Sequence, residues 1–289
     1  GTGEVIRLVG ATRVFVDIDP KTFNLDAVKL EEAVQTIAAG DQSLSKKEVL
    51  LSARGIIAVD LFGLPADYVH INAIARRNGL FVIEDAAQSF GAEQNERMAG
   101  NLADIGCTSF FPAKPLGCYG DGGMCFTNDD RLLETIQSLR VHGEGTHKYD
   151  NIRTGINGRM DTLQAAILLA KFDIFPEEVE LRQEVAQRYA TLLNQQTDVQ
   201  TPAFFDRVKS AWAQYSVLAK DEAHRAALQD RLKAAGIPTA VYYPKPLHLQ
   251  TAFKYLGYEE SDFPISEDFS KRIFSLPMHP YLSSHDQER

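Results

Sequence analysis

The sequence predicts an α/β fold with a mostly parallel sheet flanked by helices. In the first half of the chain, short apolar runs of strand length alternate with helical stretches. One of these runs, residues 79–91, is apolar until Glu84 and Asp85, as expected of a strand buried on both faces. Another, residues 105–111, leads into a glycine-rich turn that carries one lysine. The second half has the mixed pattern of a smaller α+β domain.

The spacing of apolar residues divides the chain into elements and two domains. It predicts strands at residues 11–20, 55–61, 79–85, 105–111, 124–127, 212–218 and 237–243. It predicts helices at residues 24–40, 67–78, 129–141, 161–175, 177–194, 223–235 and 266–274. Asn24 is the expected cap of the first helix, Gly79 closes the second, and residues 41–47 form a polar connection. Pro176 marks the domain boundary, which separates a large domain at residues 1–175 from a small α+β domain at residues 176–289.

Composition and charge exclude several classes of protein. Over 289 residues the formal net charge is −9, whereas a nucleic-acid-binding protein would carry a basic surface. No apolar run approaches the roughly 18 residues needed to span a bilayer, so we expect a cytoplasmic protein without a membrane partner. Cys107, Cys118 and Cys125 lack the spacing of metal ligands. We expect them to be buried, reduced side chains, and we expect no metal.

Lys114 lies between Pro112 and Pro115 in the glycine-rich turn. Stiff neighbours hold such a lysine in place, and partial burial helps its ammonium group to lose a proton. The free amine is then a nucleophile that can form a Schiff base. Taken alone, however, a solvated lysine in an ordinary turn is the more common case.

Asp85 ends a buried strand, and the ligands of open α/β sheets bind beyond the carboxyl ends of the strands. An aspartate there can pair with a pyridinium nitrogen opposite a Schiff-base lysine, which is the arrangement that lets pyridoxal 5′-phosphate act as an electron sink. The alternative for Asp85 is an N-cap of a helix that follows the strand. The combination of Asp85 with Lys114 favours pyridoxal phosphate as the cofactor.

Five motifs in the same order resemble the DegT-type nucleotide-sugar aminotransferases. They are EDAAQSFGA at 84–92, SFFPAKPLG at 109–117, GDGG at 120–123, NGRMDTLQAA at 157–166 and YPKPLH at 243–248. The resemblance runs from about residue 4 to residue 281 and implies the fold of type I pyridoxal-phosphate enzymes. It also implies transfer of an amino group from glutamate to a nucleotide-linked keto sugar in bacterial O-antigen synthesis.

The resemblance assigns four residues to the cofactor. Lys114 holds pyridoxal phosphate covalently and moves a proton between the two reacting carbons. Asp85 pairs with the pyridine nitrogen, and Gln88 meets the 3-oxygen of the ring. Ser109 contacts the phosphate group.

The same resemblance assigns a second group of residues to the partner subunit and the substrate. Asn157 reaches the phosphate held by the partner subunit, so a homodimer with shared sites is implied. Arg159, Tyr243 and His248 lie where the family contacts the sugar nucleotide, and purely structural roles are equally open for these three. The roles of His142 and of residues 143–156 are open as well.

Two rival functions are open alternatives, and one difference from the family is expected. Family members with a histidine at the position of Lys114 act as sugar dehydratases, and the same fold could serve as an inactive fragment or a regulatory scaffold. Lys114, Asp85 and Gln88 together disfavour both. Family members carry a further segment of roughly a quarter of the full chain before the first strand. We therefore expect an N-terminally truncated chain, also ending before the family's last helix, that folds but binds the cofactor weakly.

Overall fold

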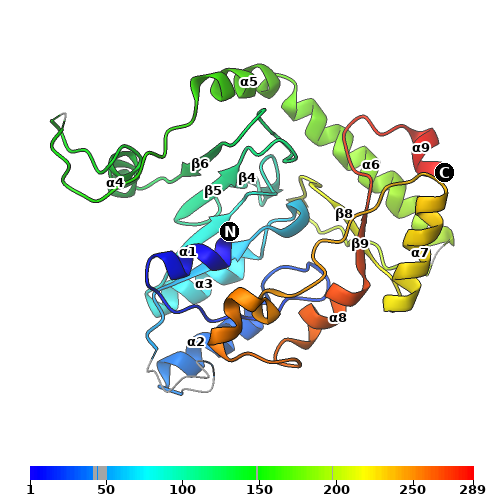
Figure 1. The fold of residues 1–289 in the computed structure, drawn as a ribbon, viewed down its shortest axis with the longest axis horizontal. Coiled ribbons are helices and arrows are strands. Elements are labelled where there is room, and N and C mark those ends of the chain that lie inside the picture. Colours follow the sequence, from blue (N-terminus) through cyan, green and yellow to red (C-terminus); the bar gives the residue numbers. More distant parts are fainter. Residues whose placement is uncertain (42–43, 45–50, 148, 197) are drawn as a thin grey trace.

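A four-stranded sheet forms the centre of the molecule (Figure 1). The computed structural model describes residues 1–41, 44, 51–147, 149–196 and 198–289. Strands β1 (Gly55–Val59), β2 (Phe81–Asp85) and β5 (Ile105–Ser109) are parallel, and β6 (Gly123–Phe126) pairs antiparallel with β5. The strand order is β1-β2-β5-β6. The expected α/β fold with a mostly parallel sheet is confirmed.

Helices α2 (Ala27–Ala38) and α3 (Tyr68–Asn78) contact each other, and α3 packs against β2. Asp67 caps α3 by accepting a hydrogen bond from the backbone N–H of His70, and Gly79 ends the helix in the left-handed conformation that glycine adopts at no steric cost. Their apolar faces contribute to one buried core with the sheet, which contains Leu30, Val34, Ile56, Ala58, Tyr68, Ile71, Ile74 and Val82.

The remaining elements that the structure describes in the first part of the molecule are a short helix near the start of the chain, a small sheet and three further helices, the last of which is long. They are α1 (Thr2–Leu8), a small sheet of β4 (Arg97–Met98), β3 (Glu93–Gln94) and β7 (Val208–Lys209), and helices α4 (Asp130–Arg140), α5 (Thr162–Phe172) and α6 (Phe175–Gln196). In Figure 1, α4 and the segment that follows it extend away from the rest of the molecule. Pro176 lies in the first turn of α6, as predicted. Within the described ranges, no helix has both the length and the apolar character needed to cross a membrane.

The second part is built around a two-stranded antiparallel sheet. It consists of β8 (Tyr215–Leu218), β9 (Ile273–Leu276), helices α7 (Glu222–Ala234), α8 (Pro264–Arg272) and α9 (Ser284–Glu288), and short 3-10 turns η2 (Leu247–Leu249) and η3 (Thr251–Leu256). A further 3-10 turn, η1 (Leu61–Gly63), lies in the first part. A cluster of buried residues joins the two parts: Phe23, Phe62, Leu218, Phe269 and Ile273. The domain division at residues 175 and 176 stays a prediction.

The predicted strand at residues 11–20 is wrong. A strand needs a neighbour for its backbone groups, and within the described chain only Ile18 forms a bridge, with Leu25. The predicted cap of the following helix is also wrong, because Asp26 rather than Asn24 accepts the hydrogen bonds from Val28 and Lys29. The predicted connection at residues 41–47 lies outside the described residues, except for residues 41 and 44.

The predicted strand at residues 237–243 is wrong as well. Only Ala240 pairs with β9, through two hydrogen bonds with Ser275, and Pro238 has no N–H to extend the ladder. The predicted helix at 266–274 begins earlier, at Pro264, and ends at Arg272, where the chain turns into β9. The prediction of three buried cysteines holds for Cys118 but is wrong for Cys125, which is exposed on β6 at the edge of the described sheet.

Candidate active site

The carboxyl ends of β2 and β5 lie at the same edge of the sheet because the two strands are parallel. Asp85 is the last residue of β2, and Ser109 is the last residue of β5. Both side chains are partly buried. The register places Asp85 opposite Cys107, two residues before Ser109. The fold therefore brings two predicted site residues from separate motifs to one edge.

The turn that carries Lys114 is held by hydrogen bonds on both sides. The backbone N–H of Lys114 donates to Phe111 O at 2.9 Å, and that of Cys118 donates to Phe110 O at 2.8 Å. At Gly117, a Cβ atom would lie only 2.6 Å from Pro112 O, so a larger residue would push this turn apart. Lys114 thus extends from a fixed backbone position after β5.

The electrostatic surroundings of Lys114 suit a nucleophilic amine. Burial lowers the pKa of the ammonium group, and the negative charge of Asp85 raises it in part. Within the described residues, Nζ of Lys114 has no hydrogen-bond or ion-pair partner. The amine is therefore partly desolvated, influenced by the charge of Asp85 and available for covalent chemistry.

Asp85 is oriented by the chain itself. The hydroxyl group of Thr2 donates to its Oδ2 atom, and the backbone N–H of Ala87 donates to Oδ1 at 3.2 Å. A carboxylate has about four lone-pair sites, so acceptor capacity remains. Sequence reasoning did not identify Thr2, because no local sequence pattern indicates a hydrogen bond to a residue so distant in the chain.

Gln88 and Ser109 each keep a donor group that has no acceptor among the described residues. The side-chain Oε1 of Gln88 accepts from the backbone N–H of Phe62 at 2.6 Å, which leaves the amide N–H group. The Oγ of Ser109 accepts from the backbone N–H of Phe111 at 3.3 Å, which leaves the hydroxyl proton. This edge of the sheet thus offers an amine, an anionic acceptor and two neutral donors. The amine suits an aldehyde, the anionic acceptor suits a pyridinium nitrogen, and the two donors suit anionic oxygens.

Two fully buried carboxyl groups lie at the ends of β1 and β2, next to this edge. Asp60 follows β1 and accepts from Tyr68 Oη at 2.9 Å and from Ser89 Oγ at 2.6 Å. Burial, together with the charge of Glu84, raises the pKa of Asp60 well above its usual range. Glu84 accepts backbone hydrogen bonds from Gly100 at 2.6 Å and Leu102 at 2.8 Å. Glu84 is thus a structural carboxyl group. Sequence reasoning did not single out Asp60, although its position at the end of a predicted strand could have indicated it.

The other predicted site residues come from later segments of the chain. Asn157 and Arg159 are exposed in the segment between α4 and α5, and Tyr243 is exposed after α7. In the described parts of the chain, their three side chains form no hydrogen bond or ion pair. His248 is only 3% exposed, and its Nε2 lies 3.0 Å from Oε1 of Glu267. The predicted substrate contact of His248 stays a prediction, and its ring is enclosed in this structure.

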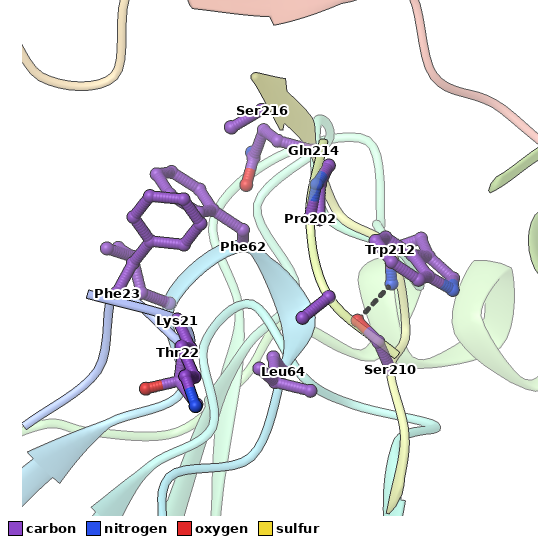
Figure 2. A pocket seen from close by; sticks show the side chains of 12 residues that line it. Lys21, Thr22, Phe23, Phe62, Leu64, Pro202, Ser210, Trp212, Gln214 and Ser216 are labelled. Atoms are coloured by element: carbon purple, nitrogen blue, oxygen red, sulfur yellow. Dashed lines mark hydrogen bonds between the residues drawn. The ribbon is translucent and has the colours of Figure 1, made fainter. Parts of the chain in front are cut away.

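A small pocket lies between the two parts of the molecule and is distinct from the site at the sheet edge (Figure 2). It is lined by residues such as Phe23, Phe62, Trp212 and Gln214, and its volume of about 20 Å³ suits one water molecule. None of the predicted site residues lines it. The buried Oε1 of Gln214 has no hydrogen-bond partner among the residues that the structure describes. The chemistry of the sheet edge therefore locates the active site better than this pocket does.

Comparison with known proteins identifies the class. The chain matches the DegT/DnrJ/EryC1/StrS aminotransferase family over residues 1–289 and belongs to it. The cofactor of this aminotransferase is pyridoxal 5′-phosphate, which agrees with the donor set at the sheet edge.

Individual relatives are similar over nearly the whole chain. The UDP-2-acetamido-2-deoxy-3-oxo-D-glucuronate aminotransferase of Pseudomonas aeruginosa is 46% identical over 283 residues, which cover 98% of this chain and 72% of that protein. A pleiotropic regulatory protein of Geobacillus stearothermophilus is 43% identical, over 99% of this chain and 73% of that one. The crystal structure of a DegT/DnrJ/EryC1/StrS aminotransferase from Brucella abortus is 49% identical with a TM-score of 0.92, over 99% of this chain and 74% of that one.

Proposed function

We propose that this aminotransferase moves an amino group from glutamate to a keto sugar carried on a nucleoside diphosphate, in the synthesis of a bacterial surface polysaccharide. The observation that carries the proposal is the partly buried, available amine of Lys114, whose pKa the charge of Asp85 influences, in a chain 46% identical to an aminotransferase of a UDP-linked 3-oxo sugar acid. When bound, pyridoxal phosphate supplies the electron sink for the exchange. We infer a cytoplasmic enzyme.

The residues of the sheet edge have separate roles in this proposal. Asp85 would accept a hydrogen bond from the protonated ring nitrogen of the cofactor, while the Thr2 hydroxyl donates to the carboxylate and keeps it in one orientation. The amide of Gln88 donates to the ring oxygen, and the hydroxyl of Ser109 donates to the phosphate. Nζ of Lys114 would hold the cofactor and, as a free base, would move a proton between the two reacting carbons. The lowered pKa of Lys114 favours the free base that this proton transfer needs.

The exposed residues complete the site in our proposal. Arg159 can hold a carboxylate of the sugar or of glutamate through two parallel hydrogen bonds, which a lysine would not reproduce. Asn157 is exposed in the segment between α4 and α5, and we propose that it reaches the phosphate bound by a partner subunit. Tyr243, 54% exposed, is available to the nucleotide sugar. We therefore propose a homodimer with two equivalent shared sites.

The substrate proposal is tested by supplying the cofactor-loaded protein with glutamate and a UDP-linked 3-keto sugar. We expect 2-oxoglutarate and the amino sugar to form in equal amounts, as measured by mass spectrometry. The matched control is the same keto sugar without its nucleotide. Equal rates with the free and the nucleotide-linked sugar would contradict the proposal.

The shared site is tested with two inactive variants. Lys114→Ala and Asn157→Ala should each have little activity alone, whereas a mixture allowed to exchange subunits should regain part of it, because one site of a mixed dimer has both residues intact. Sedimentation of the unmodified protein should show a dimer. A monomer that turns over at the same rate would rule out sharing.

A further inference from the structure

Two cysteines lie opposite each other on neighbouring strands of the central sheet. Cys107 lies in β5, Cys125 lies in β6, and the register pairs them directly. Their Sγ atoms are 3.8 Å apart. The third cysteine, Cys118, is buried and its thiol donates to Phe110 O at 2.9 Å. Only the cross-strand pair therefore brings two thiols together.

The register favours a bond between the two sulfur atoms. The backbone N–H of Phe110 donates to Gly122 O at 2.8 Å, so Phe110 and Gly122 form a hydrogen-bonded position of the antiparallel ladder. Counting back three residues, Cys107 and Cys125 occupy a position without backbone hydrogen bonds, where opposite Cα atoms are about 4.5 Å apart. Disulfides span Cα distances of about 4.4–6.8 Å. Side-chain rotation can therefore join the sulfurs without moving the strands.

The pair lies on the same face of the sheet as the active-site carboxylate. Side chains opposite each other in neighbouring strands share a face, and Cys107 is opposite both Asp85 in β2 and Cys125 in β6. Ser109, two residues along β5, shares that face as well. A chemical change at the two thiols would thus occur directly beside the site.

The two thiols differ in reactivity. Cys125 is exposed, and a hydrogen bond from Cys107 lowers the pKa of its thiol to about 7. The same contact, together with burial, raises the pKa of Cys107. Because the thiolate is the nucleophilic form, Cys125 is suited to react first and Cys107 to follow as the resolving thiol.

We propose that Cys107 and Cys125 are an oxidant-sensitive dithiol that closes into a reversible cross-strand disulfide next to Asp85. The oxidant is a peroxide. The thiolate of Cys125 attacks one peroxide oxygen, the O–O bond breaks, and a sulfenic acid forms with release of water after protonation. The thiol of Cys107 then attacks that sulfur, and a second water leaves as the S–S bond forms. Two thiols lose two electrons in total and one peroxide is reduced to two waters.

The test treats the folded protein with one equivalent of hydrogen peroxide and then unfolds it for thiol counting and peptide mapping. We expect the free thiols to fall from three to one, with the loss of two hydrogen atoms from the mass and a cross-link between the peptides of Cys107 and Cys125. Dithiothreitol should restore all three thiols. A cross-link to Cys118, a bond between chains, or oxidation without a cross-link would overturn the proposal, as would no reaction at all.

Matched variants give a second readout that does not depend on enzyme activity. Cys118→Ser should still form the cross-link. Cys107→Ser should instead stop at a sulfenic acid on Cys125, trapped by dimedone, because the resolving thiol is missing. Cys125→Ser should give neither product at the same peroxide dose. A sulfenic acid trapped on Cys107 would show that the order of the two thiols is wrong, and mapping of the unmodified protein remains decisive if a variant does not fold.

Discussion

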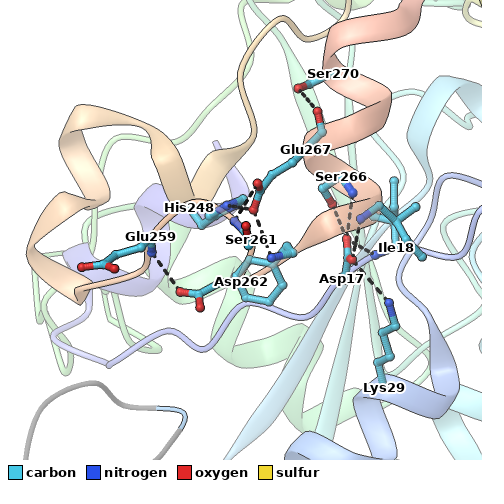
Figure 3. A network of polar contacts seen from close by, with 12 residues as sticks. Asp17, Ile18, Lys29, His248, Glu259, Ser261, Asp262, Ser266, Glu267 and Ser270 are labelled. Carbon is cyan, nitrogen blue, oxygen red and sulfur yellow. Dashed lines mark hydrogen bonds and ion pairs between the residues drawn. The ribbon is translucent and has the colours of Figure 1, made fainter. Parts of the chain in front are cut away.

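Two polar clusters of this molecule look alike in composition but differ in how their hydrogen-bonding groups are used. At the sheet edge, Lys114, Gln88 and Ser109 each keep a group without a partner among the described residues. In the cluster around Asp17 and Glu267, the carboxylates are surrounded by the protein's own donors (Figure 3). Unused donors at a fixed position are costly unless a ligand takes them, whereas saturated carboxylates serve the fold. The contrast separates function from structure better than residue type does.

The saturated cluster joins distant segments. Asp17 accepts from the backbone N–H groups of Ile265 and Ser266, both at 3.0 Å, and thereby holds the start of α8. Glu267 accepts from His248 at 3.0 Å and from the backbone N–H of Ser261 at 2.8 Å. These contacts tie the segment containing His248 to α8.

The largest expected effect is the loss of activity in Lys114→Ala. Removing a residue that transfers a proton lowers kcat by about 10²–10⁴-fold. Because Nζ has no partner among the described residues, the free energy of unfolding should change by less than about 0.5 kcal/mol. Turnover assays and urea denaturation measure the two effects, with the exposed Lys220→Ala as the control. Near-normal turnover would contradict the catalytic role that we assign to Lys114 at the sheet edge.

The second effect is on stability. Asp17→Ala leaves the partly buried backbone N–H groups of Ile265 and Ser266 without their acceptor, and should lower the free energy of unfolding by about 2–3 kcal/mol. Urea denaturation checks this value. The control is Asp268→Ala, which removes an exposed ion pair with Arg272 and should cost less than about 1 kcal/mol. Equal losses in both variants would contradict the structural role of Asp17.

The stabilising effect of Asp17 should depend on pH. Burial raises the pKa of its carboxyl group, but hydrogen bonds from Ser266, Ile18 and Ile265 together lower it by more than burial raises it. The folded-state pKa therefore lies below the ordinary value of 3.8. A lowered folded pKa gives stability that is present above about pH 4 and lost as the pH falls through the folded pKa. The difference in unfolding free energy between the unmodified protein and Asp17→Asn should therefore shrink below pH 4. A constant difference would refute this linkage.

The smallest effect is a change in the pKa of Lys114. The charge of Asp85 raises that pKa, so Asp85→Asn should lower it and move the onset of amine reactivity to lower pH. The pH dependence of acylation at Lys114 in the cofactor-free protein, followed by peptide mapping, measures the shift. Glu93→Gln, a carboxylate outside this site, is the control. An upward shift would mean that Asp85 and Lys114 do not interact as described.

The sequence was sufficient where a feature is local. The strand that ends at Asp85 and the proline-flanked turn of Lys114 are each encoded within about ten residues, and parallel pairing alone brings the strand ends together. The sequence was insufficient where a feature depends on a distant partner. No local pattern shows that Thr2 meets Asp85, or that Glu267 encloses His248. The strands expected at 11–20 and 237–243 failed for the same reason, since each lacked a neighbour to complete a ladder.

The most direct test of the account is to locate the covalent bond to the cofactor. The protein loaded with pyridoxal phosphate is reduced with borohydride, digested and mapped by mass spectrometry. We predict a single stable adduct on the peptide that contains Lys114, and no adduct in Lys114→Ala, because this amine is partly desolvated and has no hydrogen-bond or ion-pair partner in the described chain. An adduct on a different lysine, or one that survives in Lys114→Ala, would contradict the account.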